Sequence, residues 1–318
     1  MTDPFAAFSN RLAALAALGA AATVAVHARD GRARSGLLWA TGLVVTAEEA
    51  LERDDELFLE LPDGSRVPAA LAGRDPGTGV ALLRAETGAI AALPPAPSAG
   101  TADTLAAGHL LLTVGQGGHG PVVGFGAAAT VGGAWRSMRG GRLERRILLG
   151  HRLAPEAEGG AVLDQAGRLV GMAVPLGHRR SRRGALAIPV ETIFRVVEVL
   201  RTRGRVARGY LGLATQSVQV GPGPAGDRPA GDRPAGDRPG AAGRGLIVVG
   251  IDPQGPAAQA GMLLGDVLVA WDGVALGTVH EMLTRLDPDS VGTEVVLDLV
   301  RAGQPARLTV RISERAAA

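Results

Sequence analysis

From residue 22 to about residue 188, the sequence consists of short apolar stretches rich in β-branched residues, separated by glycine, proline and aspartate turns. Stretches of this length and spacing predict an all-β barrel or sandwich. The expected strands fall within Gly36–Thr46, Leu57–Leu61, Val80–Arg84, His109–Val114, Pro121–Val131, Arg146–His151 and the hairpin Ala161–Val174. Aromatic residues make up 3% of the chain and cysteine is absent, so small and branched aliphatic side chains must fill the core without disulfides.

Two helical patterns bracket this β-rich region. Residues 12–26 are nearly all apolar, and we expect a leading helix over residues 5–20, followed by a first strand over Thr23–Ala28. A second helix is predicted over Val190–Arg203, where apolar residues recur at helical spacing and Gly204 follows as a stop signal. This helix closes a first domain, which we place at residues 1–203.

The apolar stretch near the N-terminus also bears on location. Residues 12–26 are too few to span a bilayer, so no membrane span is expected. Asp3 and a single preceding arginine are atypical of a signal peptide. We therefore expect a cytoplasmic protein, with export to the periplasm or membrane association as the alternative.

A second unit, residues 204–318, has its own strand and helix pattern and contains a low-complexity insertion at about 221–244. Within it, Ala-Gly-Asp-Arg-Pro is repeated three times over residues 225–239. The proline and glycine content of this repeat prevents a packed core, so we expect a disordered surface loop.

The charge pattern argues against a nucleic-acid partner. The net charge is +2 with a pI of about 10.1, and all basic residues apart from histidine are arginines, interspersed with acidic residues. A nucleic-acid binder gathers its basic residues on one face with stacking aromatics between them. Two local clusters of arginines, Arg142, Arg145 and Arg146, and then Arg179, Arg180, Arg182 and Arg183, are interpreted as solvated loops.

The second unit carries an ordered set of short motifs. Gly255-Pro256-Ala257-Ala258 opens a short helix that ends at Gly261, Gly265-Asp266-Val267-Leu268 begins a strand, and Asp272-Gly273 makes a tight turn. This order resembles the PDZ domains of the HtrA/Deg family of proteases. The resemblance implies a groove to which the C-terminal or extended hydrophobic segment of a partner protein adds as a strand.

The resemblance also assigns the peptide-binding residues. The loop for the terminal carboxylate would be Tyr210, Leu211, Gly212 and Leu213, whose successive backbone N–H groups form a nest. A helix expected over Thr278–Leu286 would supply Val279, Met282 and Leu286, with Leu283 as the alternative to Met282 because one of the two must be core.

Three segments of the first domain resemble the catalytic segments of the same family. Thr46-Ala47-Glu48-Glu49 lies where the family has its catalytic histidine, Gly73 to Leu83 resembles the segment of the catalytic aspartate, and Pro155 to Ala161 resembles the nucleophile loop. The implied fold is mainly β: a trypsin-like double β-barrel followed by an α+β PDZ domain. Position by position, Glu49, Gly79 and Glu158 would replace histidine, aspartate and serine.

These replacements predict a degenerate triad, because no nucleophile, imidazole base or orienting carboxylate remains at those positions. The chain is therefore expected not to be an enzyme but a pseudoprotease that acts as a scaffold through its PDZ domain, without cofactor or metal. A homo-oligomer or association with an active homologue is left open. Glu49 and Glu158 should share a partly buried cleft, where like charges raise the pKa of at least one of them. An arginine from residues 179–183 that reached into the cleft would neutralise the pair and cancel this effect.

Two alternatives remain. The chain could be an active serine endopeptidase whose catalytic residues lie elsewhere than these positions. Alternatively, Glu48, Glu49 and Glu158 could converge with His151 on a hard cation, or act as paired carboxylates.

Overall fold

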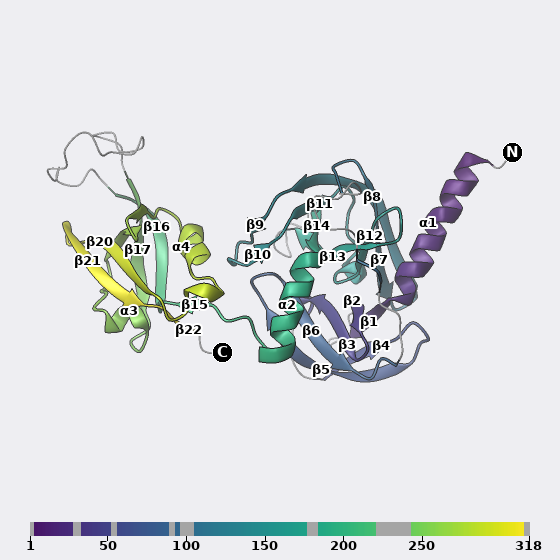
Figure 1. Cartoon of the computed structure of the whole chain (residues 1–318), viewed down its shortest axis with the longest axis horizontal. Helices are drawn as coiled ribbons and strands as arrows, with labels where there is room; N and C mark the ends of the chain where they lie inside the picture. The colour runs from purple at the N-terminus through teal and green to yellow at the C-terminus, as the bar shows by residue number, and fades with distance from the viewer. Residues whose placement is uncertain are drawn as a thin grey trace. The chain divides into compact units, whose positions relative to one another are not determined.

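The computed structural model describes residues 3–27, 33–51, 56–88, 93–95, 105–176, 184–220 and 243–314 (Figure 1). It is mainly β, with two closed six-stranded barrels followed by a smaller mixed unit, which confirms the predicted fold class. The chain divides into two compact units, Met1–Ser137 with Gly141–Val206, and Met138–Gly140 with Ala207–Ala318. The predicted repeat loop lies outside the described residues.

The first barrel closes in the order β1-β2-β3-β6-β5-β4. Its strands are β1 (Thr23–His27), β2 (Ala33–Ala40), β3 (Leu43–Ala47), β4 (Leu57–Glu60), β5 (Arg66–Asp75) and β6 (Val80–Ala85). The stretch Gly36–Thr46, expected as one strand, is a hairpin of β2 and β3, because Gly42 adopts a φ of 76° and reverses the chain.

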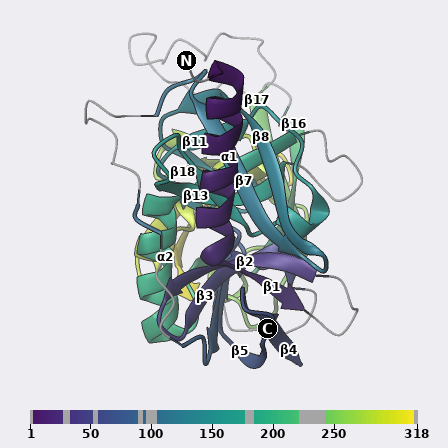
Figure 2. The same ribbon diagram turned by 90° about the vertical axis from the view of Figure 1, so that its right-hand side faces the viewer.

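The second barrel closes in the order β11-β14-β13-β12-β7-β8. Its strands are β7 (Leu110–Gly117), β8 (Gly120–Gly132), β11 (Arg146–Leu149), β12 (Ala161–Leu163), β13 (Leu169–Leu176) and β14 (Gly184–Pro189), and a short ribbon pairs β9 (Trp135–Arg136) with β10 (Arg142–Leu143). The predicted leading helix is α1 (Pro4–Ala21), which lies along β7 and β8 (Figure 2). Gly19 allows the close approach, since a Cβ there would lie 2.8 Å from Val114 Cγ2.

The helix α2 (Val190–Arg203) has the predicted bounds and ends at Gly204, which is left-handed with a φ of 70°. Its buried face includes Ile193, Val196 and Leu200. These side chains join a core cluster with Leu37 of the first barrel, so α2 helps to hold the two barrels together.

The second unit is built on a sheet in the order β16-β17-β18-β20-β21. Its elements are β15 (Gly209–Tyr210), β16 (Leu213–Val220), β17 (Gly243–Ile251), α3 (Pro256–Gln259), β18 (Val267–Trp271), β19 (Val274–Ala275), α4 (Val279–Arg285), β20 (Glu294–Arg301), β21 (Gln304–Arg311) and β22 (Ser313–Glu314). The turn at Asp272 and Gly273 has positive φ at both residues, as a tight hairpin requires. Thr278 and Glu281 form a capping box that starts α4.

Among the described residues of this unit, Asp266 is the most deeply buried carboxylate, at 1% exposure. Arg301 donates from Nε at 2.8 Å and from Nη2 at 2.7 Å, one bond to each carboxylate oxygen, and the backbone N–H of Leu263 donates at 2.8 Å. These bonds favour the charged form, and the Arg301 guanidinium in particular holds the pKa of Asp266 below its ordinary value.

We expect this depressed pKa to make the second unit acid-sensitive. A group whose pKa is lower in the folded state contributes stability above its unfolded pKa of about 3.9 and loses it as pH falls through the folded value. Thermal melts between pH 7 and pH 2 should show the loss. Asp266→Asn should be less stable at pH 7, by about 2 kcal/mol, and should show a smaller decline below pH 4 than wild type. Parallel pH profiles would contradict the assignment.

Candidate functional site

A short 3₁₀ turn, Glu48–Ala50, follows β3 and carries the two glutamates near the predicted histidine position. Glu48 is buried, and its Oε1 lies 3.3 Å from Arg74 Nη1. Glu49, the residue assigned to the histidine position, is exposed. The backbone N–H of Glu48 donates to Gly79 O at 2.9 Å, which brings this turn beside the segment predicted to hold the aspartate position.

The turn before β6 is organised by Asp75, which is 2% exposed. Its carboxylate accepts from the backbone N–H of Gly77 at 3.0 Å and from the Thr78 hydroxyl at 2.7 Å. Gly79, assigned to the aspartate position, has a φ of 76°, a conformation in which a side chain would be strained. The carboxylate in this segment therefore stabilises a turn, which is a structural use that local sequence spacing did not indicate.

The loop predicted to carry the nucleophile begins with a 3₁₀ turn, Pro155–Ala157. Glu158, assigned to the serine position, is 3% exposed, and its Oε2 lies 3.4 Å from Arg34 Nε of β2. Its backbone N–H donates to Pro155 O at 3.3 Å. The loop thus presents a buried carboxylate whose charge is balanced by a guanidinium from the first barrel.

Ser35, the neighbour of Arg34, clamps the same loop. Its hydroxyl donates to Glu156 O at 2.6 Å and accepts from the backbone N–H of Gln116 at 2.8 Å. Its own backbone N–H donates to Glu158 O at 2.8 Å. Sequence reasoning missed Arg34 and Ser35, because the contact joins residues more than 120 positions apart and leaves no local pattern.

Glu49 and Glu158, which were predicted to share a partly buried cleft, differ in their exposure in the structure. Glu158 is buried while Glu49 is exposed, and the cation near Glu158 is Arg34. The arginines at 179–183, which were considered for that role, lie outside the described residues. Of the other arginine cluster, Arg145 is not solvated as expected: it is 6% exposed, and its Nη2 lies 2.8 Å from Glu191 Oε1.

The cation alternative finds no support among the residues that the structure describes, which contain no group of three histidine, cysteine or acidic side chains able to hold a metal. Within the described part of the chain, His151 makes no hydrogen bond or ion pair with Glu48, Glu49 or Glu158. Its Nε2 is 2.8 Å from the Thr113 hydroxyl, and burial lowers its pKa, so the neutral imidazole is favoured.

In the second unit, the predicted carboxylate loop joins β15 to β16. Gly212 has a φ of 77°, and a Cβ there would lie 3.0 Å from Gly255 Cα. The carbonyl oxygens of Leu211 and Gly212 accept from the backbone N–H groups of Ala257 and Asp252, at 2.9 and 2.8 Å. Within the described part of the chain, the backbone N–H groups of Leu211 and Gly212 have no acceptor. Two adjacent donors are therefore available to an anion.

The wall of the predicted groove is only partly as expected. β16 is an edge strand, paired with β17 on one side. Leu213 and Val279 are half-buried at the margin of the core. Met282 and Leu286, also predicted to line the groove, are 4% and 7% exposed and belong to the core cluster, because α4 packs this face against the sheet. Leu283, the weighed alternative, is half-buried. The Tyr210 hydroxyl donates to Asp252 Oδ2 at 2.9 Å and braces the loop.

Family models match both units. The trypsin-like peptidase domain matches residues 34–172, and the PDZ domain matches residues 209–312. Among the described residues, no helix is long and apolar enough to cross a bilayer.

Curated relatives match across both units. A probable periplasmic serine endoprotease of the DegP-like type from Halomonas elongata is 26% identical over 282 residues, which are 86% of this chain and 54% of the relative. A protein of the same description from Pseudomonas fulva is 27% identical, over 85% of this chain and 53% of its own length. The putative serine protease HhoB of Synechocystis is 26% identical, over 89% of this chain and 66% of its own length. The chain thus spans about half to two thirds of these relatives.

Solved structures share the fold. The HtrA-type protease AlgW in complex with a decapeptide superposes with a TM-score of 0.69 at 22% identity, covering 96% of this chain and 99% of that one. A serine endoprotease from Yersinia pestis gives a TM-score of 0.68 at 21% identity, covering 96% and 98%.

The relatives contradict two predictions. Two are named probable serine endoproteases and the third a putative serine protease, which points to a protease and not to the predicted non-enzyme. The Halomonas and Pseudomonas proteins are named periplasmic, which points to export and contradicts the predicted cytoplasmic location.

The resemblance that the motifs suggested is confirmed over both units. The two domain models match in the expected order, the relatives match over most of the chain, and the fold is that of the HtrA-type structures. This chain belongs to the HtrA family.

Proposed function

We propose that this protein binds C-terminal or extended hydrophobic segments of other proteins through its PDZ domain. The observation that carries the proposal is the pair of adjacent backbone N–H groups, at Leu211 and Gly212, that have no acceptor within the described residues. A terminal carboxylate would accept from both. The edge of β16 would pair with the peptide backbone, and Leu213 and Val279 would contact an aliphatic side chain.

We expect a decapeptide with a free carboxylate and a terminal aliphatic residue to bind the full chain weakly, because ordering the peptide costs entropy. Amidation of the same peptide should weaken binding by roughly tenfold or more, since the negative charge that the two N–H groups would bind is removed. Fluorescence anisotropy with labelled peptides measures both affinities. Equal affinities would contradict the proposed carboxylate site.

Leu213→Asp tests the contribution of the groove wall to peptide binding. It places a charge at the half-buried start of β16, and it should abolish binding while the melting temperature changes little. Val274→Asp, at a residue 56% exposed in the same unit, is the control and should bind as wild type. Loss of binding in both variants would indicate a general effect of added negative charge.

The second candidate function is the endoproteolysis named for the relatives, favoured by the match of residues 34–172 to the trypsin-like peptidase domain. Glu158 carries no hydroxyl and is paired with Arg34, so a serine nucleophile for this activity would have to be another residue. Casein cleavage measures the activity. Labelling with a fluorophosphonate probe, followed by mass spectrometry of the labelled peptide, identifies the reacting serine.

A further inference from the structure

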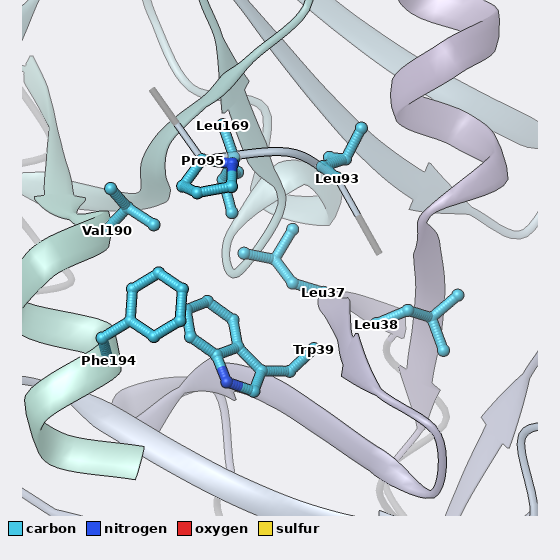
Figure 3. A pocket seen from close by; sticks show the side chains of 8 residues that line it. All are labelled: Leu37, Leu38, Trp39, Leu93, Pro95, Leu169, Val190 and Phe194. Carbon is cyan, nitrogen blue, oxygen red and sulfur yellow. The ribbon is translucent and has the colours of Figure 1, made fainter. Parts of the chain in front are cut away.

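An apolar pocket of about 230 Å³ opens in the first unit between β2, β13 and α2 (Figure 3). Leu37, Leu169 and Val190 line its inner side and belong to the core cluster that joins the two barrels. Trp39 and Phe194 line its outer side. The pocket involves neither the loop at 155–160 nor the PDZ groove.

A β-bulge places Trp39 at this pocket. The pairing of β2 with β3 shifts register between Leu38 and Ala40, which leaves Trp39 as the extra residue. Bulges of this kind redirect a side chain. Here the indole packs edge-on against Phe194, with ring centroids 4.6 Å apart at 63°. Phe194 is 49% exposed although it lies on a helix whose other face supplies core residues, so two large aromatic side chains border an opening to solvent.

The chemistry of the lining restricts what could bind. Among the described residues, every one that lines the pocket is leucine, valine, proline, phenylalanine or tryptophan, without a charged group. In Figure 3 the indole nitrogen of Trp39 lies on the side of the ring away from Pro95 and Leu169. A charged or strongly polar ligand would lose its hydration without a partner, which is costly. Cavities of roughly 150 Å³ with apolar linings bind benzene, so this volume has room for a larger molecule.

We propose that this pocket binds a neutral, apolar small molecule about the size of a single aromatic ring or of two fused rings. The aromatic pair would cover its outer side and the core of the two barrels its inner side. This site is independent of peptide capture by the second unit, so either proposal can fail without the other.

Titration of the full chain with toluene, followed by methyl NMR, tests the proposal. Saturable shifts are expected at the methyl groups of Leu37, Leu169 and Val190, with a dissociation constant on the order of 1 mM, as befits a ligand of so few atoms. Benzoate, of similar shape but charged, should cause no saturable shifts there. Absence of saturable toluene shifts, or equal binding of benzoate, would overturn the proposal.

Two variants localise the site. Leu93→Trp, at a half-buried pocket residue, should fill the space and weaken toluene binding by about tenfold, a loss of about 1.4 kcal/mol. Leu263→Trp, at a residue 52% exposed in the other unit, is its control and should bind as wild type. Phe194→Ala removes an outer wall with little risk to folding, and its binding should also weaken. Unchanged affinity in both pocket variants would overturn the assignment.

Discussion

Gly159→Ala should destabilise the first unit by about 4 kcal/mol or more, an exceptionally large effect for a single substitution. Gly159 has a φ of 87°, and a Cβ there would lie closer than 3.0 Å to the backbone oxygen of Ser35 and 2.9 Å from the Thr46 hydroxyl oxygen. Ser35 O already accepts from that hydroxyl at 2.7 Å. The added methyl group must therefore displace β2 or the loop.

Gly64→Ala separates the cost of backbone strain at positive φ from the cost of the steric clash with Ser35. Gly64 has a similar φ of 82° but nothing within 4 Å of a built Cβ, so only backbone strain of about 1–2 kcal/mol should appear. Urea unfolding can be followed by Trp39 and Trp135, both in the first unit, after Trp271→Phe removes the tryptophan of the second unit. Similar losses in the two variants would mean that the contact with Ser35 is unimportant.

Glu158→Ala should cost about 3 kcal/mol, because it leaves the Arg34 guanidinium in a largely buried position without its carboxylate. The side chains of Arg34 and Glu158 are 17% and 4% exposed. Arg34→Ala leaves the buried carboxylate of Glu158 without this guanidinium and should lower the free energy of unfolding by a similar amount. The double variant should be less destabilised than the sum of the two, since neither charge then remains.

The exposed pair of Asp298 and Arg307 is the control for this cycle. Its Nε–Oδ1 distance is 2.7 Å, but the arginine side chain is 68% exposed, so Asp298→Ala should cost less than about 1 kcal/mol. Additive losses for Arg34 and Glu158 in urea unfolding would show that the two residues do not interact in the folded protein.

The sequence was most informative where one segment contains its own signals. The helix Val190–Arg203 was predicted with correct bounds because its apolar spacing and Gly204 are both local. The tight turn at Asp272 and Gly273 was likewise predicted from adjacent residues. In contrast, β5 was not predicted, since Pro68 interrupts the strand and residues of similar polarity, such as Ala69 and Ala70, lie on its two faces and hide the period of two.

The candidate sites depended on contacts that a single sequence does not reveal. The clamp of Ser35 on the loop at 155–160 requires the two barrels to meet, and the choice between Met282 and Leu283 depends on how α4 rotates against the sheet. The resemblance to the family supplied positions such as Glu158, but it gave no information about Arg34, because that partner comes from the other barrel.

Within the described ranges β16 pairs only with β17, and its other edge has a consequence for solution behaviour. Edge strands are usually protected from pairing with other chains by charged residues or by irregular geometry. β16, Leu213–Val220, contains no charged residue, and a bulge between Ala214 and Thr215 is the irregularity that interrupts its ladder with β17. The same edge that would receive a peptide is therefore suited to pair with β16 of a second molecule, so concentrated protein should aggregate less readily when a peptide ligand is bound.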